Sequence, residues 1–509
     1  MGTAARLWRL ARGDDTGAEA GSMIEPLYLG GEIAVVERDL AGEKVKEISE
    51  EGIAQLLKEG RELQRELCDL PLEERLGVVQ NLAEIWRERL AAGELAGLKL
   101  DLQRNTGYPS RLIDMEMSLV AKALDIEEIK RNLASSLIGG KESLYSFAEV
   151  TKGEYIRNMP AGPALIIASG NSIIPTLIPT VISLVTGNFT FLKPSITNYN
   201  AVTEIFSGLR ELMSKSPAAR LMARSLCVSY LGHDSPGLKT ALTSSPFGVV
   251  NYWGGEPGRS VVAAQVAQNP WHPKLFFNGP LTGVALIGKG ADSEDVARGL
   301  AMNMVIYEQQ LCSSPTIAAY LGEYNDALAF AERVGTHLDA IGSTFNTEVS
   351  NDALFVTHSA RKILALKGSK VLASRRTDNP WTLAISPSRS NLDEVMRSFP
   401  SFNIHGRRRF LEFVVLKDMI QALDLISSIP GMKAYTGIDK VQTVGMALPE
   451  SMRREALRLL PSSGAYRFVP IEDMFMRSAV EPYDGMPLAA LFTYAVYERA
   501  RPIPLEVGF

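Results

Sequence analysis

Residues 161–192 read AGPALIIASGNSIIPTLIPTVISLVTGNFTFL and form the most apolar window of the chain. A run of this length could be mistaken for a membrane-spanning helix. Residues that break helices interrupt it at Pro163, Pro175, Pro179, Gly162, Gly170 and Gly187. Because these residues divide the window into short pieces, it predicts a buried strand, a turn and a short helix, which together make one βα unit.

Strands and helices alternate on the C-terminal side of this window. The expected strands cover residues 164–168, 189–192, 225–231 and 248–252, with helices up to Thr186 and over residues 201–213 and 259–268. Such alternation predicts the α/β class with a doubly wound parallel sheet. A second α/β segment is expected from about Lys274, with strands at residues 284–287 and 316–320.

The N-terminal side has a different pattern. We expect a short strand pair within residues 24–36 and one long amphipathic helical region over residues 45–67. Two further helical stripes cover residues 76–90 and 112–124. Between residues 144 and 157 the apolar residues alternate around a turn at Lys152-Gly153, which predicts a β-hairpin.

The composition is that of a globular, enzyme-sized protein. The 509 residues are 46% hydrophobic and 22% charged, and this length predicts two or three domains. A net charge of −5 argues against a nucleic-acid-binding surface. The three cysteines include no CxxC pair, which argues against disulfides or structural zinc and predicts a reducing, cytoplasmic location. Residues 1–23 lack the apolar core of a signal peptide, and we expect a disordered extension there.

The last cysteine, Cys312, stands in the stretch YEQQLCSSP at residues 307–315. Upstream, Asp292 and Ser293 can cap a helix whose apolar residues recur at helical spacing, and Pro315 stops that helix. Cys312 is therefore predicted at a helix-to-strand junction, where backbone N–H groups and neighbouring serines suit a nucleophilic thiol. The alternative is a buried structural cysteine, because unpaired cysteines are among the most buried residues.

Two patches at predicted strand ends can carry chemistry. Asn171 follows the strand at residues 164–168, at the edge where an open α/β sheet binds ligands. Its amide can donate to an oxyanion, although an asparagine in a turn is often only a turn former. Lys193 and Ser195 follow the next strand, where a lysine suits ribose or phosphate oxygens, and a solvated lysine is the alternative.

A third patch is the glycine turn at residues 253–259, WGGEPGR, between a strand and a helix. Gly254 and Gly255 would let the backbone approach a dinucleotide, and the helix start could meet a phosphate. The turn lacks the full GxGxxG spacing, so by itself it indicates a nucleotide site only weakly.

Taken in this order, the asparagine turn, the Lys-Pro-Ser strand end, the glycine turn and the cysteine resemble the aldehyde dehydrogenase superfamily. Within it, residues 307–315 resemble most the long-chain acyl-CoA reductase family, whose fatty aldehydes feed bacterial luminescence. The resemblance covers nearly the whole chain from about Ile24. It implies a Rossmann-type cofactor-binding domain, an α/β catalytic domain and β arms that mediate oligomerisation.

The resemblance also implies domain bounds. Residues 24–273 would form the cofactor-binding domain, including an arm hairpin at 142–158, and residues 274–475 the catalytic domain. Residues 476–509 would form a C-terminal segment, with the second arm at residues 488–497.

The resemblance assigns roles to the candidate site residues. It implies that Cys312 is the nucleophile and that Asn171, with the Cys312 backbone N–H, forms the oxyanion hole. It likewise implies that Lys193 and Ser195 meet the adenosine ribose, and that Gly254 and Gly255 lie beside the dinucleotide. No metal site is expected.

Two departures from the superfamily pattern are informative. Asn278 stands where hydrolytic aldehyde dehydrogenases have a glutamate base, and an amide cannot take a proton from water at neutral pH. The acyl-enzyme should therefore favour thioester exchange or reduction over hydrolysis. Ser195, Ile196 and Thr197 stand where NAD-preferring members have an acid, so NADPH is the expected cofactor and NADH the alternative.

The sequence thus predicts NADPH-dependent reduction of a long-chain fatty acyl-CoA or acyl-protein thioester to the aldehyde. The alternatives are an aldehyde-oxidising, CoA-acylating dehydrogenase and a catalytically silent scaffold. An acyl-protein synthetase partner, a homo-oligomer and no membrane span are also expected. Arg407, Arg408 and Arg409 could contact coenzyme A phosphates, but a solvated basic turn is the favoured interpretation.

Overall fold

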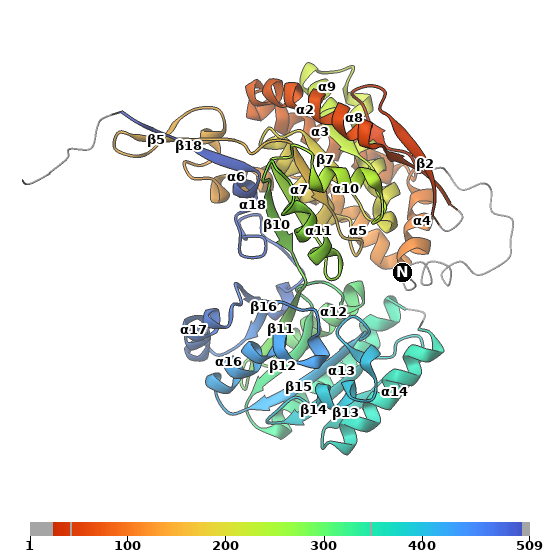
Figure 1. The fold of residues 1–509 in the computed structure, drawn as a ribbon. Helices are drawn as coiled ribbons and strands as arrows, with labels where there is room; N and C mark the ends of the chain where they lie inside the picture. The colour runs from red at the N-terminus through yellow and green to blue at the C-terminus, as the bar shows by residue number, and fades with distance from the viewer. Residues whose placement is uncertain (1–23, 41–42, 347–348, 501–509) are drawn as a thin grey trace, which may run out of the picture. The chain divides into compact units, whose positions relative to one another are not determined.

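The computed structural model describes residues 24–40, 43–346 and 349–500. The extension predicted at residues 1–23 lies outside the described residues, as does the end of the C-terminal segment. The chain divides into two compact units. The first comprises residues 1–106, 114–278 and 478–509, and the second comprises residues 107–113 and 279–477. Figure 1 shows the elements of each unit.

The first unit is built on a six-stranded sheet with the order β1-β8-β7-β6-β9-β10. All neighbours are parallel except β1 and β8. The strands are β1 (Leu27–Tyr28), β6 (Ala164–Ile167), β7 (Thr190–Lys193), β8 (Leu226–Val228), β9 (Val249–Trp253) and β10 (Lys274–Asn278). The strand order reverses between β6 and β9, which is the switch point where such sheets bind ligands.

Helices cover both faces of this sheet. The helices of this unit are α2 (Glu50–Asp69), α3 (Leu72–Ala91), α4 (Ala96–Thr106), α5 (Ser110–Ala123, whose first residues are assigned to the second unit), α6 (Ile126–Ser136), α7 (Ile174–Val185), α8 (Tyr199–Leu212), α9 (Pro217–Arg224), α10 (Pro236–Thr243), α11 (Gly258–Val266) and α18 (Leu488–Leu491). One core cluster joins α2, α10 and α11 to the side chains of Leu165 and Ile167. Ala164 and Ile166 alternate with them, are fully buried and point to the opposite face, where α7 packs on β6 and β7.

The strands and helices predicted within residues 164–268 are all present, because buried parallel strands are continuous apolar runs. Two further helices, α9 and α10, were not predicted. The N-terminal prediction was wrong in two places. The strand pair expected within residues 24–36 does not form, because β1 pairs with β8 instead. Residues 43–48 form strand β3 (Glu43–Ile48), which pairs with β2 (Val35–Leu40), and the helix begins only after Ser49. Ser49 caps it by accepting from the backbone N–H of Gly52 at 3.1 Å. Val45 and Ile48 are fully buried from a strand, and their spacing had mimicked a helix.

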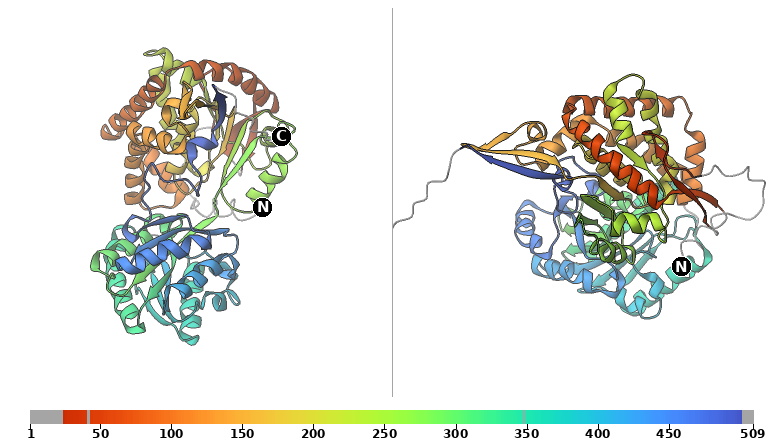
Figure 2. Two further views of the ribbon diagram at one scale, coloured as in Figure 1. Left: turned by 90° about the vertical axis from the view of Figure 1, so that its left-hand side faces the viewer. Right: turned by 45° about the horizontal axis from the view of Figure 1, so that its top comes forward.

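A three-stranded antiparallel sheet with the order β18-β5-β4 projects from the first unit (Figure 1 and Figure 2). Its strands are β4 (Ala148–Thr151), β5 (Glu154–Pro160) and β18 (Thr493–Arg499). The hairpin with its turn at Lys152-Gly153 is confirmed, but Leu144 lies in a 3-10 turn before the first strand. The expected arm strand from Leu488 was partly wrong, because a short helix precedes β18.

The second unit is built on a seven-stranded sheet with the order β13-β14-β15-β12-β11-β16-β17, parallel except for β13. The strands are β11 (Leu281–Gly288), β12 (Pro315–Leu321), β13 (Lys370–Ala373), β14 (Thr382–Pro387), β15 (Phe410–Leu416), β16 (Lys440–Ala447) and β17 (Arg467–Pro470). This segment was expected to begin at about Lys274, whereas the strand that starts there, β10, pairs with β9 and belongs to the first sheet.

Helices also cover both faces of the second sheet. They are α12 (Glu294–Val305), α13 (Tyr324–Thr344), α14 (Asn351–Leu366), α15 (Leu392–Met396), α16 (Met419–Ser428) and α17 (Glu450–Leu459). One core cluster joins α14, α15, α16 and α17 to a single face of the strands. On α13, Phe330 packs edge-to-face on Phe413 of β15 at a ring distance of 6.1 Å. No helix within the described parts of the chain has the length and apolarity needed to cross a bilayer.

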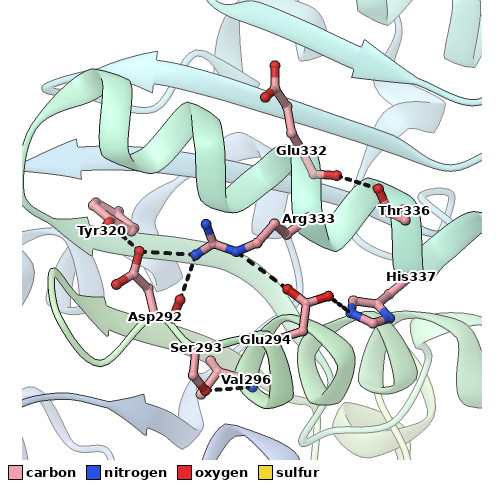
Figure 3. Close-up of polar contacts among 9 residues, drawn as sticks. All are labelled: Asp292, Ser293, Glu294, Val296, Tyr320, Glu332, Arg333, Thr336 and His337. Atoms are coloured by element: carbon pink, nitrogen blue, oxygen red, sulfur yellow. Dashed lines mark hydrogen bonds and ion pairs between the residues drawn. The ribbon is translucent and has the colours of Figure 1, made fainter.

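A polar cluster fixes the N-terminal end of α12 to α13 (Figure 3). Arg333 donates to the backbone oxygen of Asp292 at 2.6 Å and to its carboxylate at 3.3 Å. Glu294 pairs with the Nε of Arg333 at 3.7 Å and with the Nε2 of His337 at 2.7 Å. The hydroxyl of Tyr320 completes the cluster by donating to Asp292 at 3.0 Å. The helix that precedes Cys312 is therefore held firmly at its start.

We expect Arg333→Met to lower the free energy of unfolding by about 1 kcal/mol, because the backbone oxygen of Asp292 loses a charged donor. The matched control is Arg298→Met, which removes an exposed pair with Asp295 on the same helix and should cost less than about 0.5 kcal/mol. Urea denaturation followed by circular dichroism measures both. Equal losses in the two variants would show that the cluster does not hold α12.

Candidate active site

Cys312 lies between a 3-10 turn, η3 (Ile306–Gln309), and strand β12. The predicted position at a helix-to-strand junction is confirmed, although α12 itself ends earlier, at Val305. The thiol is half-buried, and none of the three cysteines forms a disulfide. The position of the Cys312 thiol therefore depends on the contacts of the loop that joins α12 to β12.

The cysteine loop, residues 306–314, includes η3 and contains three successive residues with left-handed backbone conformation. The φ angles of Tyr307, Glu308 and Gln309 are +50°, +51° and +63°. For residues with a Cβ atom this conformation costs roughly 1–2 kcal/mol each, and it persists only where surrounding contacts determine it. The side chains of the same loop provide those contacts.

Glu308 forms a buried, two-pronged ion pair with Arg409. The Nη2 of Arg409 lies 2.6 Å from one carboxylate oxygen of Glu308, and its Nε lies 3.3 Å from the other. Arg409 is 1% exposed and also donates to Oδ1 of Asn379 at 2.6 Å. Burial raises the pKa of Glu308, and the positive charge of Arg409 opposes that rise.

Gln309 and Gln310 hydrogen-bond the loop to the backbone at the start of β15. Gln309 donates to the backbone oxygens of Pro315 and Phe410 at 2.6 and 2.8 Å and accepts from the N–H of Phe410 at 2.8 Å. Gln310 donates to the backbone oxygen of Arg407 at 3.1 Å. The Glu-Gln-Gln sequence thus fastens the cysteine loop to the start of β15.

The basic turn at residues 407–409 is neither a simple solvated turn nor a set of free cations for coenzyme A phosphates. Arg407 and Arg409 are buried, and Arg407 lies 4.7 Å from the ring centre of Tyr435. Only Arg408 is exposed. The prediction of a solvated basic turn was therefore wrong for two of the three residues, because their charges are used within the fold.

Two β-bulges surround the cysteine loop. Gly283 on β11 pairs with Pro315 while Val284 pairs with Ile317, so β12 has one extra residue here. On the other side, Thr282 pairs with Val441 and Gly283 with Thr443, so Gln442 is the extra residue of β16. A Cβ atom at Gly283 would lie 2.3 Å from the backbone oxygen of Ser313, and glycine therefore lets the loop lie directly on β11.

Gln442 contacts the candidate nucleophile. Its Nε2 donates to Sγ of Cys312 at 3.2 Å, and the glutamine is fully buried. Sequence reasoning missed this residue because no motif marks it. The available signal was a glutamine within the otherwise apolar strand sequence VQTVGMA, where a buried polar side chain needs a partner.

In the first unit, Asn171 and Ser195 lie on neighbouring turns at the carboxyl ends of β6 and β7. Oδ1 of Asn171 accepts from the hydroxyl of Ser169 at 2.9 Å. A Cβ atom at Gly170 would lie 2.5 Å from Oγ of Ser195, so glycine permits the close approach of the two turns. Thr197 links them further by donating to the backbone oxygen of Gly170 at 3.0 Å.

Beneath the Asn171 turn lies a buried carboxyl group that the sequence analysis did not identify. Glu116 of α5 accepts from the N–H of Ile173 at 2.6 Å, where helix α7 begins. Burial raises the pKa of Glu116 to about 7, and hydrogen bonds from Ser172 and Ile173 oppose the rise. Glu116 therefore helps to position the asparagine turn.

Lys193 ends β7 and is almost fully buried. Within the described chain its ammonium group forms no hydrogen bond or ion pair, and it lies 5.3 Å from the ring centre of Tyr230. Burial lowers its pKa to about 8, and the charge of Glu47 opposes this. Glu47 lies on β3 and accepts from the N–H of Gly232 at 2.7 Å and from Arg38 at 3.2 Å. A buried lysine whose ammonium group forms no ion pair within the described chain suits a phosphate or ribose group.

The glycine turn follows β9. The N–H of Gly254 donates to the backbone oxygen of Asn278 at 3.1 Å, and the backbone oxygen of Gly255 accepts from the hydroxyl of Tyr252 at 3.1 Å. A Cβ atom at Gly254 would lie 2.9 Å from that hydroxyl. The turn leads into α11, whose nine residues start at Gly258. The carboxylate of Glu256 accepts from the N–H of Ser260 in the first turn at 3.1 Å, so a phosphate would share this helix N-terminus with it.

Asn278 ends β10 and is buried. Its Oδ1 accepts from Asn251 at 2.7 Å, and its amide nitrogen donates to the carboxylate of Asp484 at 2.9 Å. Asp484 was missed because it lies far away in the sequence, in the C-terminal segment. A carboxylate therefore adjoins the position where the superfamily pattern has a glutamate.

The first unit thus brings together Asn171, Lys193, Ser195, Gly254 and Gly255 at the carboxyl ends of adjacent strands. Cys312 belongs to the second unit, at the amino ends of its strands. Within the residues that the structure describes, no group of three or more His, Cys, Asp or Glu side chains is arranged to hold a metal ion.

We expect Glu308→Gln to lower the free energy of unfolding by about 3 kcal/mol or more, because it leaves the guanidinium of Arg409 buried without its counter-charge. The double variant Glu308→Gln with Arg409→Met should recover part of that loss, since no uncompensated charge remains. A urea-denaturation cycle of the single and double variants measures the coupling. Strictly additive losses would contradict the role of the ion pair.

Known proteins match this chain over most of its length. A model of the family described as acyl-CoA reductase (LuxC) matches residues 67–494. The long-chain acyl-protein thioester reductase 2 of Photobacterium leiognathi is 21% identical over 435 residues, which cover 84% of this chain and 83% of that protein.

Solved structures show the fold. The NAD-dependent aldehyde dehydrogenase of Sinorhizobium meliloti has a TM-score of 0.67 at 14% identity and covers 96% of this chain and 97% of its own. The glyceraldehyde-3-phosphate dehydrogenase GapN of Methanocaldococcus jannaschii, complexed with NADP, has a TM-score of 0.65 at 12% identity, with 90% and 95% coverage. The aldehyde dehydrogenase fold inferred from the sequence is confirmed. Because the family model spans most of its length, this chain belongs to the acyl-CoA reductase (LuxC) family.

Proposed function

We propose that this protein reduces a long-chain fatty acyl thioester to the fatty aldehyde with NADPH, through an acyl group carried on Cys312. Family membership makes it an oxidoreductase that acts on acyl groups. The observation that carries the finer proposal is the anchored loop that presents the half-buried thiol of Cys312 beside an amide donor. A purely structural cysteine would not need a strained loop with its own buried ion pair.

The chain's own groups account for the acyl-transfer steps. The Cys312 thiolate attacks the carbonyl carbon of the thioester and forms a C–S bond. The negative oxygen that develops needs preorganised donors, a role that we assign to the amide of Asn171 and the backbone N–H of Cys312. The bond to the leaving thiol then breaks, and the acyl group remains on Sγ. After reduction the C–S bond breaks again, which releases the aldehyde and restores the thiolate.

The nicotinamide cofactor, when bound, supplies the hydride for the reduction. We assign its binding to Lys193, Ser195, Gly254 and Gly255. Lys193 offers a buried cation without a bound anion, and the turn before α11 offers a helix N-terminus. These are the features that a dinucleotide's ribose and phosphate groups require.

The preference for NADPH is supported by the charges beside Lys193. Ser195 and Thr197 present hydroxyl groups that hydrogen-bond to each other at 3.1 Å. The nearby carboxylate of Glu47 is already neutralised by its ion pair with Arg38. A 2′-phosphate would therefore meet a cation and neutral hydroxyl groups rather than an uncompensated anion. NADH is the alternative, and parallel assays with both cofactors distinguish them.

The acyl donor is proposed as a fatty acyl-CoA or a fatty acyl-protein thioester. The curated relatives are named for reduction of long-chain acyl-protein thioesters. A donor of the second kind implies an acyl-protein synthetase as partner. We also propose that the protein acts in the cytoplasm as a homo-oligomer. The projecting sheet supports the latter, because it exposes Val150, Tyr494 and Tyr497.

Wild-type protein should oxidise NADPH in the presence of acyl-CoA, with rates that depend on chain length. Cys312→Ala should abolish both this activity and acylation, whereas Cys68→Ala should retain them, since Cys68 is a half-buried cysteine of the helix α2. Radiolabelled acyl-CoA followed by peptide mapping locates the acyl group. Label retained on the Cys312→Ala variant would contradict the assignment.

We expect the acyl-enzyme to resist hydrolysis because Asn278 replaces a base. Asn278→Glu alone would place a second carboxylate against Asp484, which should raise the pKa of the pair and blunt the gain. Asn278→Glu combined with Asp484→Asn restores a donor at that position. In the combined variant the ratio of released acid to aldehyde should be at least about ten times that of wild type, because a general base becomes available.

Single-turnover quench after loading with acyl-CoA measures the ratio of acid to aldehyde. Asp484→Asn alone is the matched control and should leave the ratio unchanged. An unchanged ratio in the acylated double variant would show that exclusion of water, rather than the missing base, protects the acyl-enzyme.

A further inference from the structure

We propose that Gln442 is a further catalytic residue, whose side-chain amide stabilises the sulfur of Cys312 as a thiolate. This inference rests on the proposed nucleophilic role of Cys312. The amide nitrogen lies 3.2 Å from Sγ, within hydrogen-bonding distance for sulfur. Gln442 is fully buried, so water cannot readily take over this donation if the amide is removed.

A chain of hydrogen bonds fixes the orientation of the Gln442 amide. Its Oε1 accepts from the hydroxyl of Thr443 at 3.1 Å. The oxygen of Thr443 in turn accepts from Nη1 of Arg467 at 3.4 Å, and Arg467 donates to the backbone oxygen of Met474 at 2.8 Å. Because the arginine can only donate, the threonine proton points to the glutamine oxygen, and the NH2 group faces the sulfur.

The bulge in β16 explains why this side chain reaches the cysteine. Gln442 is the residue at which the register of β16 on β11 shifts, between the pairs of Val441 and Thr443. A bulge re-aims the side chain of the inserted residue and is common beside active sites. The matching bulge at Thr316 of β12 brings the cysteine loop down onto the same position of β11.

A neutral amide suits this task for a chemical reason. A hydrogen bond to a charged acceptor is stronger than one to its neutral form, so the donor favours thiolate over thiol. The thiolate occurs twice in the proposed cycle, when sulfur attacks the thioester and when it leaves the reduced carbon. An amide has no proton to lose near neutral pH, so it can donate at both steps without changing its own charge.

The elements that pack against the loop carry Arg407, whose guanidinium lies over the ring of Tyr435, the exposed Arg408, and Lys440, whose ammonium lies over the ring of Tyr466. They also carry Arg467 and Arg409, and the loop itself carries Glu308. Arg467 acts through Thr443, and the charges of Glu308 and Arg409 neutralise each other. Removal of the Gln442 amide should therefore change the titration of Cys312 without altering these charges. Two substitutions separate the effect of the donor from that of packing. Gln442→Met keeps the side-chain length and removes the donor, and Gln442→Glu keeps the shape and replaces the donor by an acceptor.

The test is the rate of alkylation of Cys312 by iodoacetamide between pH 5 and 10, on the full chain and without substrate. Mass spectrometry quantifies the label on each cysteine peptide, and Cys68 serves as the internal control for general loosening. We expect Gln442→Met to slow the reaction of Cys312 about tenfold at pH 7 and to raise the midpoint of its pH profile by about one unit. Gln442→Glu should raise the midpoint further, because a carboxylate disfavours a neighbouring thiolate.

An unchanged midpoint in both variants would overturn the proposal. A parallel change at Cys68 and Cys312 would also overturn it, because it would indicate a packing role for Gln442. A shifted midpoint at Cys312 alone supports it. This readout does not depend on acyl-CoA reduction, so an inactive wild-type enzyme would count against the proposed function while the alkylation profile still decides the role of Gln442.

Discussion

The second unit depends on the buried ion pair between Glu308 and Arg409. Three successive left-handed residues are costly, and nothing in their local sequence favours them. In that conformation the side chains of Glu308, Gln309 and Gln310 all find hydrogen-bond partners around the start of β15. The position of Cys312 is thus determined by strand β15, which begins a hundred residues later in the chain, at Phe410.

The two sheets present their candidate site residues at opposite ends. In the first unit they follow the carboxyl ends of β6, β7 and β9, where helix N-termini also lie and anions are favoured. In the second unit Cys312 and Gln442 lie toward the amino ends of β12 and β16. No helix N-terminus is built into that loop, and the polarity comes from side-chain amides and bulged strands instead. The first arrangement suits a charged cofactor, and the second suits a reactive sulfur.

The sequence predicted what depends on local patterns and missed what depends on distant contacts. Buried strands such as β6 and β7 are apolar runs bounded by glycine or proline, so the α/β order and the candidate residues at their ends could be identified. Strand β3 was missed because Val45 and Ile48, three residues apart, match the helical period and not the strand period of two, yet both are buried. The helix begins only after the cap at Ser49. Gln442, Glu116 and Asp484 have no local signal, since each acts on a residue from another part of the chain.

The projecting sheet has a consequence for how the chain is made on the ribosome. Strand β5 is flanked on one side by β4, its immediate neighbour in sequence, and on the other by β18 from the C-terminal segment. While the second unit is being synthesised, β5 therefore has an unpaired edge that can join any passing strand. Only the last stage of translation provides its partner. A ribosome that stalls before Thr493 would release a chain that still lacks this strand.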